Sequence, residues 1–181
     1  EHARSTYVSF VDDDDQVPDY YVQQVRTAIH EYANAHTEPV PGVPGPTGWV
    51  TSFPDQVGWR MQHYSDGVPS KPTYHSLTYG GWHEDERGYY RDVSHLNPIR
   101  RDLALAHGDF RRASPPEDVT WSDQMRPHVK TEARISDEYM MYHYYSSGDS
   151  TWRPGSVTGL PEYRRPQIEH PLFAWHPESS T

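Results

Sequence analysis

The chain has 181 residues, a formal net charge of −10 and no cysteine. The charge argues against non-specific binding to nucleic acid or anionic lipid, and the lack of cysteine excludes disulfides and thiolate metal sites. Leu, Ile, Val and Phe total 28 residues, about 15% of the chain, below the roughly 20% at which a self-sufficient core becomes doubtful. Yet 14 Tyr and 6 Trp are present, and these types are common where proteins bury side chains in partners. We therefore expect a chain that completes its fold against other proteins.

The first segment, residues 1–36, combines a short strand with a helix. Residues 6–11 alternate and are rich in strand-forming types, and the acidic run 12–15 that follows is expected to be a solvated turn. Residues 19–36 carry apolar side chains at three- and four-residue spacing behind Pro18, which predicts an amphipathic helix. We expect this helix to dock on a partner through Val22, Val25, Ile29 and Tyr32.

The next two segments show little regular periodicity. Residues 37–48 contain four prolines and three glycines, which is typical of an extended linker or of an arm laid over a neighbour. Residues 49–95 carry many aromatic residues among Gly and Pro without a sustained period. We expect loops and short strands there.

Three short helices are predicted in residues 96–148. Asn97-Pro98 is a typical helix start, and Gly108 would allow a left-handed exit after His107. A second helix is expected from the capping box at Ser114 to Met125, and a third from about 131 to 147. The third is aromatic on every side, so we expect it to touch partners through Tyr139 and Tyr142.

Residues 149–181 are predicted to be an extended C-terminal arm, with Trp152, Phe173 and Trp175 buried in partners. The fold class expected from all segments is mostly irregular, with a few α-helices and little β. The chain would be extended and rich in proline and aromatic residues rather than a compact domain with a single core.

Catalytic motifs are weak. His107-Gly108-Asp109 matches the His-x-Asp pair of non-haem iron oxygenases, a site that needs one further, distant His. The run that starts at His83-Glu84 lacks the second His of a zinc hydrolase, and no nucleophile elbow, phosphate loop or dinucleotide fingerprint occurs. We therefore expect no enzyme, no metal and no cofactor, with a His/carboxylate metalloenzyme as an alternative.

Two segments carry a resemblance. GGWHEDERGYY at 80–90 and WRPGSVTGLPEY at 152–163 are similar to stretches of the mimitin-like accessory subunit of respiratory complex I. As a class, the chain resembles the soluble accessory subunits of mitochondrial inner-membrane complexes, those of the respiratory chain and of ATP synthase. The resemblance implies an extended structural protein without an active site.

The function predicted from these observations is that of a non-catalytic accessory subunit that bridges or clamps neighbouring subunits. The expected assembly is a large multisubunit complex at the mitochondrial inner membrane, to which this chain would be peripheral, without a transmembrane segment or nucleic acid. The start at Glu1 fits a processed mature protein. Alternatives are a structural component of a virion or appendage, the metalloenzyme, and an extracellular carbohydrate-binding domain.

Overall fold

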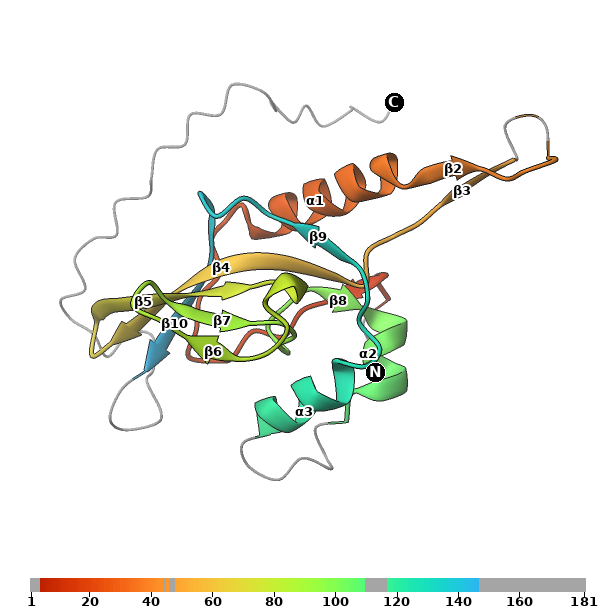
Figure 1. Ribbon diagram of the computed structural model, residues 1–181. Helices are drawn as coiled ribbons and strands as arrows, with labels where there is room; N and C mark the ends of the chain where they lie inside the picture. The colour runs from red at the N-terminus through yellow and green to blue at the C-terminus, as the bar shows by residue number, and fades with distance from the viewer. Residues whose placement is uncertain (1–3, 44, 46–47, 110–116, 147–181) are drawn as a thin grey trace, which may run out of the picture.

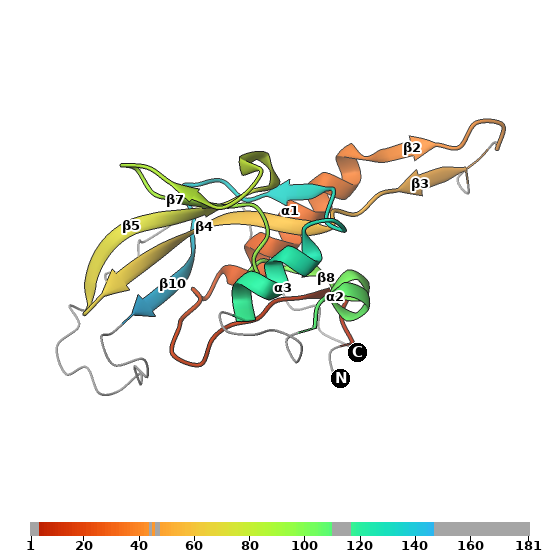
Figure 2. The ribbon, with the colours of Figure 1, turned by 60° about the horizontal axis from the view of Figure 1, so that its bottom comes forward.

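The computed structural model describes residues 4–43, 45, 48–109 and 117–146, which form a mixed sheet with three helices packed around it (Figures 1 and 2). The helices are α1 (Tyr21–Ala35), α2 (Arg101–His107) and α3 (Glu117–Met125), with a short 3-10 turn, η1 (Leu77–Tyr79). The eight strands of the sheet are β1 (Tyr7–Val8), β4 (Gln56–Ser65), β5 (Val68–His75), β6 (His83–Glu84), β7 (Tyr89–Arg91), β8 (Ile99–Arg100), β9 (Glu132–Arg134) and β10 (Met140–Ser146). A separate two-stranded sheet consists of β2 (Thr37–Pro39) and β3 (Trp49–Thr51).

The sheet is organised around β4, its longest strand. The strand order is β1-β8-β4-β5-β7-β6, and β9 and then β10 run parallel to β4 in succession. The β4–β5 pair is an antiparallel hairpin that turns at Asp66-Gly67, where both residues have positive φ. Strands from three of the segments distinguished in the sequence therefore meet in one sheet.

One core lies between α1 and β4. Val25 and Ala28 of α1 pack with Trp59 and Met61 of β4, and Tyr142 of β10 closes the cluster. Trp59 makes an edge contact with Tyr21, whose ring centroid lies 6.0 Å away. Helix α1 thus buries part of the apolar stripe that its spacing predicts, Val25 and Ala28, within its own chain, whereas Val22 is 65% exposed. Among the described residues, no helix is long and apolar enough to cross a bilayer.

A second core joins α2 and α3 to the start of the sheet. Trp121 of α3 is 1% exposed and packs with Ile99 of β8 and Ala104 of α2. Gly108 follows α2, and a Cβ at this position would lie 2.3 Å from Trp121 Nε1. Gly108 has an extended backbone rather than the left-handed exit that we expected, so its role is to let the indole approach.

The predicted fold class is wrong, because the described chain contains a large mixed sheet and two cores. The scarcity of aliphatic residues is offset by larger side chains: Trp59, Trp121, Met125, Met141 and Tyr142 are all almost fully buried. A buried aromatic residue removes about 150 to 250 Å² from water, more than an aliphatic one. Of the aromatic residues that we assigned to partners, Tyr142 belongs to the protein's own interior, together with Trp59 and Trp121.

The predicted helix over 131–147 is also wrong, since this segment forms β9 and β10. Aromatic side chains favour strands, and the free edge of β4 supplies hydrogen-bonding partners that the local sequence does not show. A register shift between Met140 and Tyr142 places both Met141 and Tyr142 inside the core. That bulge interrupts the alternation by which a strand is recognised.

The segment 49–95, for which loops and short strands were expected, contains the two long strands β4 and β5. Nearer the N-terminus, the predicted strand over 6–11 is reduced to β1. After this segment, α2 begins at Arg101 rather than beside Asn97. The acidic run is not uniformly solvated: Asp13 is exposed, whereas Asp15 is buried and accepts a hydrogen bond from the Tyr145 N–H at 2.9 Å.

Candidate interaction surface

The β2–β3 hairpin, which we call the hairpin arm, projects from the body of the molecule beyond the C-terminal end of α1 (Figures 1 and 2). Trp49 and Val50 of β3 are 55% and 56% exposed, and Val43 in the connection is exposed as well. Glu38 and Pro39 of β2 also face solvent. The hairpin arm thus presents large apolar side chains to solvent.

Local interactions explain why this segment forms a hairpin rather than a loose linker. Pro39 pairs with Trp49 and Thr37 with Thr51, whose hydroxyl oxygens lie 3.0 Å apart. The Val40 N–H donates to the Gly48 carbonyl, and the Ser52 N–H donates to the His36 carbonyl at 3.0 Å. The prolines limit the freedom of the chain, so the hairpin arm is pre-organised and loses little entropy on binding.

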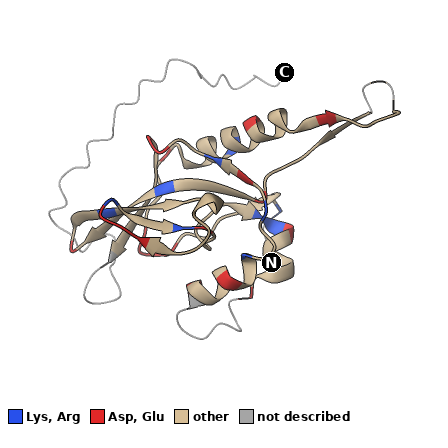
Figure 3. Ribbon diagram, in the orientation of Figure 1, with Lys and Arg blue, Asp and Glu red and all other residues tan. Residues whose placement is uncertain are grey.

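A hairpin of this kind is poorly stabilised by itself. Within the described chain, β2 and β3 pair only with each other, and an isolated two-stranded hairpin is at best marginally stable in water. Residues 37–52 include one charged residue, Glu38 (Figure 3). Charged side chains normally keep an edge strand from pairing with another chain, and here that protection is small. An exposed Trp on a pre-organised, nearly uncharged hairpin is typical of an interaction element.

A groove of about 680 Å³, which we call the α1 groove, lies beside α1 on the body. Its apolar lining comes from α1, from the N-terminal strand and from the segment after β3, with Val8, Val22, Val25, Ile29, Phe53 and Pro98 as the principal side chains. Val22 is 65% exposed and Phe53 is 48% exposed. The groove is therefore a second apolar surface, and Phe53 connects it to the base of the hairpin arm.

Polar groups in the floor of the groove are paired and uncharged. The Tyr7 hydroxyl donates to the Pro54 carbonyl, and burial raises its pKa far above the usual value. The Tyr21 hydroxyl lies 2.6 Å from Ser9 Oγ, and burial raises the pKa of Tyr21 to about 12. The rim carries Arg26, the one Lys or Arg among the described residues that line the groove. The groove thus offers an apolar floor and a basic rim.

The structure brings together three of the predicted partner-binding residues. Val22, Val25 and Ile29 all line the α1 groove, although Val25 is mostly buried against the sheet. Tyr32 lies outside this lining and stacks on His36, with ring centroids 3.8 Å apart.

The other predicted partner-binding residues lie elsewhere. Tyr139 packs on Tyr20, and Tyr142 is completely buried in the core, where no partner can reach it. Trp152, Phe173 and Trp175 lie outside the described residues.

The residues that sequence reasoning missed are Trp49, Val50 and Phe53. Their signal was present, since Trp49 directly follows a Pro/Gly-rich stretch that we interpreted as an arm or linker. The boundary drawn at residue 48 separated Trp49 from that stretch. Pairing of β2 with β3 across the boundary makes the two segments one element.

The residues proposed for a metalloenzyme do not assemble into a site. His107 and His128 stack with ring centroids 3.5 Å apart, and the described part of the chain contains no group of three or more His, Asp or Glu side chains arranged to hold a metal. The acidic run from His83 lies on the exposed β6–β7 turn. There, Asp85 Oδ1 accepts the N–H groups of Arg87 and Gly88.

Comparison with protein-family models, with curated proteins and with solved structures finds no match to this chain.

Proposed function

We propose that the protein is a non-catalytic structural subunit that clamps a neighbouring subunit with its hairpin arm. The observation that carries the proposal is the exposure of Trp49 and Val50 on a hairpin that projects from a folded body. Burying two such side chains in a neighbour is favourable, because each removes apolar surface from water at about 25 cal/mol per Å². The apolar cores of the body are buried within the chain, whereas the hairpin arm exposes its apolar side chains to solvent.

A second copy of the chain is the neighbour that the geometry favours. The arm extends along the direction of α1 (Figure 2). Phe53, just after β3, lines the α1 groove. The paired strands of the arm, Thr37–Pro39 and Trp49–Thr51, span about 10 Å, and the 15 residues of α1 span about 22 Å, so one helix is long enough to hold the arm of a partner copy. Two copies related by a two-fold axis would therefore lay each arm along the other's α1, with the same contact made twice.

Charge supports this arrangement. The arm carries Glu38, whereas Arg26 lies on the rim of the groove, so exchange of arms pairs an acidic with a basic side chain. The apolar residues at positions 43, 49 and 50 would meet Val22 and Ile29 of the partner copy. An interface of this kind is closed, which is the usual form of a soluble homo-oligomer.

The test is the mass of the full chain in solution over about a hundredfold range of concentration. We expect a dimer that dissociates on dilution, and a monomer for the double variant Trp49→Ala/Val50→Ala. Val22→Asp should have the same effect from the groove side, because it places a carboxylate in an apolar contact. The matched control is Val68→Ala/Leu105→Ala, which removes equally exposed apolar side chains outside both surfaces.

A wild-type chain that stays monomeric at every concentration would overturn the choice of a second copy and point to an unlike subunit. A dimer that survives both Trp49→Ala/Val50→Ala and Val22→Asp would overturn the role of the hairpin arm. Crosslinking from a photoreactive residue at position 49 separates these outcomes, since it identifies the chain that the arm contacts.

The location at the mitochondrial inner membrane stays a prediction that derives from the two resembling segments. Co-migration of a tagged chain with a respiratory or ATP synthase complex in native gels would support it. Recovery of the tagged chain outside mitochondria would contradict it.

A further inference from the structure

A cleft of about 1050 Å³ lies between the β4–β5 hairpin and the N-terminal segment. Met61, His63, Thr73 and His75, from β4 and β5, form its floor. Segment 9–14 borders the cleft on one side. Trp82, Arg91 and Asp118 border it on another. This cleft shares with the proposed dimer surface only Ser9, so the two can be tested independently.

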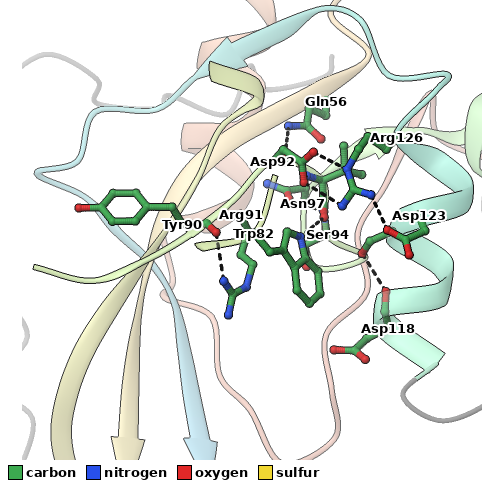
Figure 4. Close-up of polar contacts among 12 residues, drawn as sticks. Gln56, Trp82, Tyr90, Arg91, Asp92, Ser94, Asn97, Asp118, Asp123 and Arg126 are labelled. Carbon is green, nitrogen blue, oxygen red and sulfur yellow. Dashed lines mark hydrogen bonds and ion pairs between the residues drawn. The ribbon is translucent and has the colours of Figure 1, made fainter. Parts of the chain in front are cut away.

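A hydrogen-bonded network holds in place the side of the cleft that Trp82, Arg91 and Asp118 form (Figure 4). Asp92, next to Arg91, forms an ion pair with Arg126, which directly follows α3, and Arg126 also pairs with Asp123 of α3. Gln56 Nε2 donates to the Asp92 carbonyl at 2.9 Å. The end of β7 and helix α3 are thereby fixed to each other, and the cleft between them is pre-formed.

The floor contains a buried imidazole, that of His75, and the neighbouring groups determine which of its two nitrogens carries the proton. Asn97 Nδ2 donates to the Val57 carbonyl at 2.9 Å, and Asn97 Oδ1 accepts the Ser94 N–H at 3.1 Å. These two bonds fix the orientation of the amide, so the Asn97 Oδ1 that lies 3.1 Å from His75 Nδ1 is an acceptor. His75 Nδ1 therefore carries the proton, and Nε2 is a bare acceptor.

His75 Nε2 is buried and has no hydrogen-bond partner among the described residues. The side chain is 1% exposed and lines the cleft, and its Nδ1 faces Asn97, which does not line the cleft; we infer that the opposite ring edge, with Nε2, faces the cavity. Burial lowers the pKa of His75 to about 3, which keeps the imidazole neutral at physiological pH. A buried acceptor of this kind is costly unless a ligand or water donates to it.

The charged groups around the cleft favour a cation. Asp12, Asp13, Asp14 and Asp118 line it, and Arg91 is the one Lys or Arg among its described lining residues. The Arg91 guanidinium lies 4.7 Å from the Trp82 ring centroid and donates to the Tyr90 carbonyl at 3.0 Å, so it is held at the rim. Burial lowers the pKa of His63 to about 4, and this second imidazole adds no positive charge.

We propose that the cleft binds a small organic cation with primary ammonium groups, of the linear diamine or polyamine class. One ammonium donates a hydrogen bond to His75 Nε2, and the other amines lie against the carboxylates of Asp12 and Asp14. An ammonium group has three donors and no acceptor, which matches a site whose open positions are acceptors. Phe10, Trp82 and Tyr144 supply aromatic surface for the methylene chain and for cation–π contact.

The experiment is calorimetric titration of the full chain with spermidine at low salt. Wild type should bind, and Asp12→Asn/Asp14→Asn should weaken binding about tenfold or more, since charge-assisted hydrogen bonds are lost. Asp66→Asn/Glu138→Gln is the matched control. It removes the same charge at exposed positions outside the cleft and should change affinity less than about twofold.

The role of His75 is tested by His75→Phe, which keeps a ring stacked on Trp59 and removes the acceptor. Binding of spermidine should weaken about tenfold, whereas tetramethylammonium, which has no hydrogen-bond donor, should bind wild type and His75→Phe equally. A circular dichroism melt confirms that this variant is folded, and Asp12→Asn/Asp14→Asn remains informative if it is not.

Absence of spermidine binding to wild type at millimolar concentration would overturn the proposal. Equal losses in the cleft variant and in the control variant would also overturn it, because the attraction would then be non-specific. Equal binding of spermidine to wild type and to His75→Phe would remove His75 from the site.

Discussion

The body of the molecule and the hairpin arm use the same residue type in opposite ways. Trp59 and Trp121 are 1% exposed and form the centres of two cores, whereas Trp49 is 55% exposed on the arm. Within the body, aromatic and Met side chains replace the aliphatic residues that the composition lacks. On the arm, large apolar side chains stay exposed, and we propose that a neighbouring subunit buries them. The comparison shows that a chain poor in aliphatic residues can be self-sufficient in one region and dependent in another.

The largest effect is expected at the centre of the body. Trp59→Ala should lower the free energy of unfolding by about 3 to 5 kcal/mol, because it opens a cavity beneath α1. Trp59→Phe should cost far less, since the phenyl ring fills most of the space. The indole Nε1 that it removes is buried without a hydrogen-bond partner among the described residues. Urea unfolding of both variants checks the order, and equal losses would show that Trp59 packs less tightly than described.

An intermediate effect is expected at Asp15, which links the N-terminal segment to β10. Burial raises the pKa of this carboxyl to about 7, so between pH 4 and 7 the folded state holds a proton that the unfolded state releases. This contribution is present at low pH and is lost as the pH rises through 7. Asp15→Asn lacks the titration and should gain about 2 to 3 kcal/mol relative to wild type between pH 5 and pH 8.

The measurement for Asp15 is the difference between two stability profiles across this pH range. Taking the difference cancels the opposite contribution of His63 and His75, whose lowered pKa values remove stability as the pH falls below about 6.5. The exposed neighbour Asp13→Asn is the control and should run parallel to wild type. A parallel profile for Asp15→Asn would mean that Asp15 is charged in the folded protein.

The smallest effect is expected on the arm. Trp49→Ala should change the unfolding free energy of the dilute, monomeric chain by less than about 0.5 kcal/mol, although it removes as large a side chain as Trp59→Ala. At high concentration the same variant should lose the stabilisation that dimerisation gives to wild type. A large loss at low concentration would show that Trp49 packs on its own body and would remove the distinction between the two regions.

Part of the fold follows from local sequence. The helix predicted over 19–36 is confirmed as α1, because apolar residues at helical spacing behind a proline leave few alternatives. The second predicted helix ends at Met125, as expected. The strand β4 also had a readable signal in the alternation Val57, Trp59, Met61, which we overlooked among the surrounding glycines and prolines.

For the candidate interaction surface, the sequence indicated the docking face of α1 and the presence of an arm. It did not indicate that Trp49 belongs to that arm, because pairing across the Pro/Gly stretch is a contact between residues distant in sequence. The cleft was not predictable at all. Its floor, rim and acidic border come from β5, from the end of β7 and from the N-terminal segment, which only the sheet brings together.

The sequence by itself therefore determined the features that depend on neighbours a few residues away: α1, the end of α3 and the stiffness of the hairpin arm. The tertiary structure alone decided which aromatic residues are buried, that 132–146 forms strands beside β4, and that Asp15 leaves the solvent. The physical reason is that strand pairing and burial are settled by contacts between distant segments, which outweigh local preference. Composition counts the apolar side chains but does not say where each of them goes.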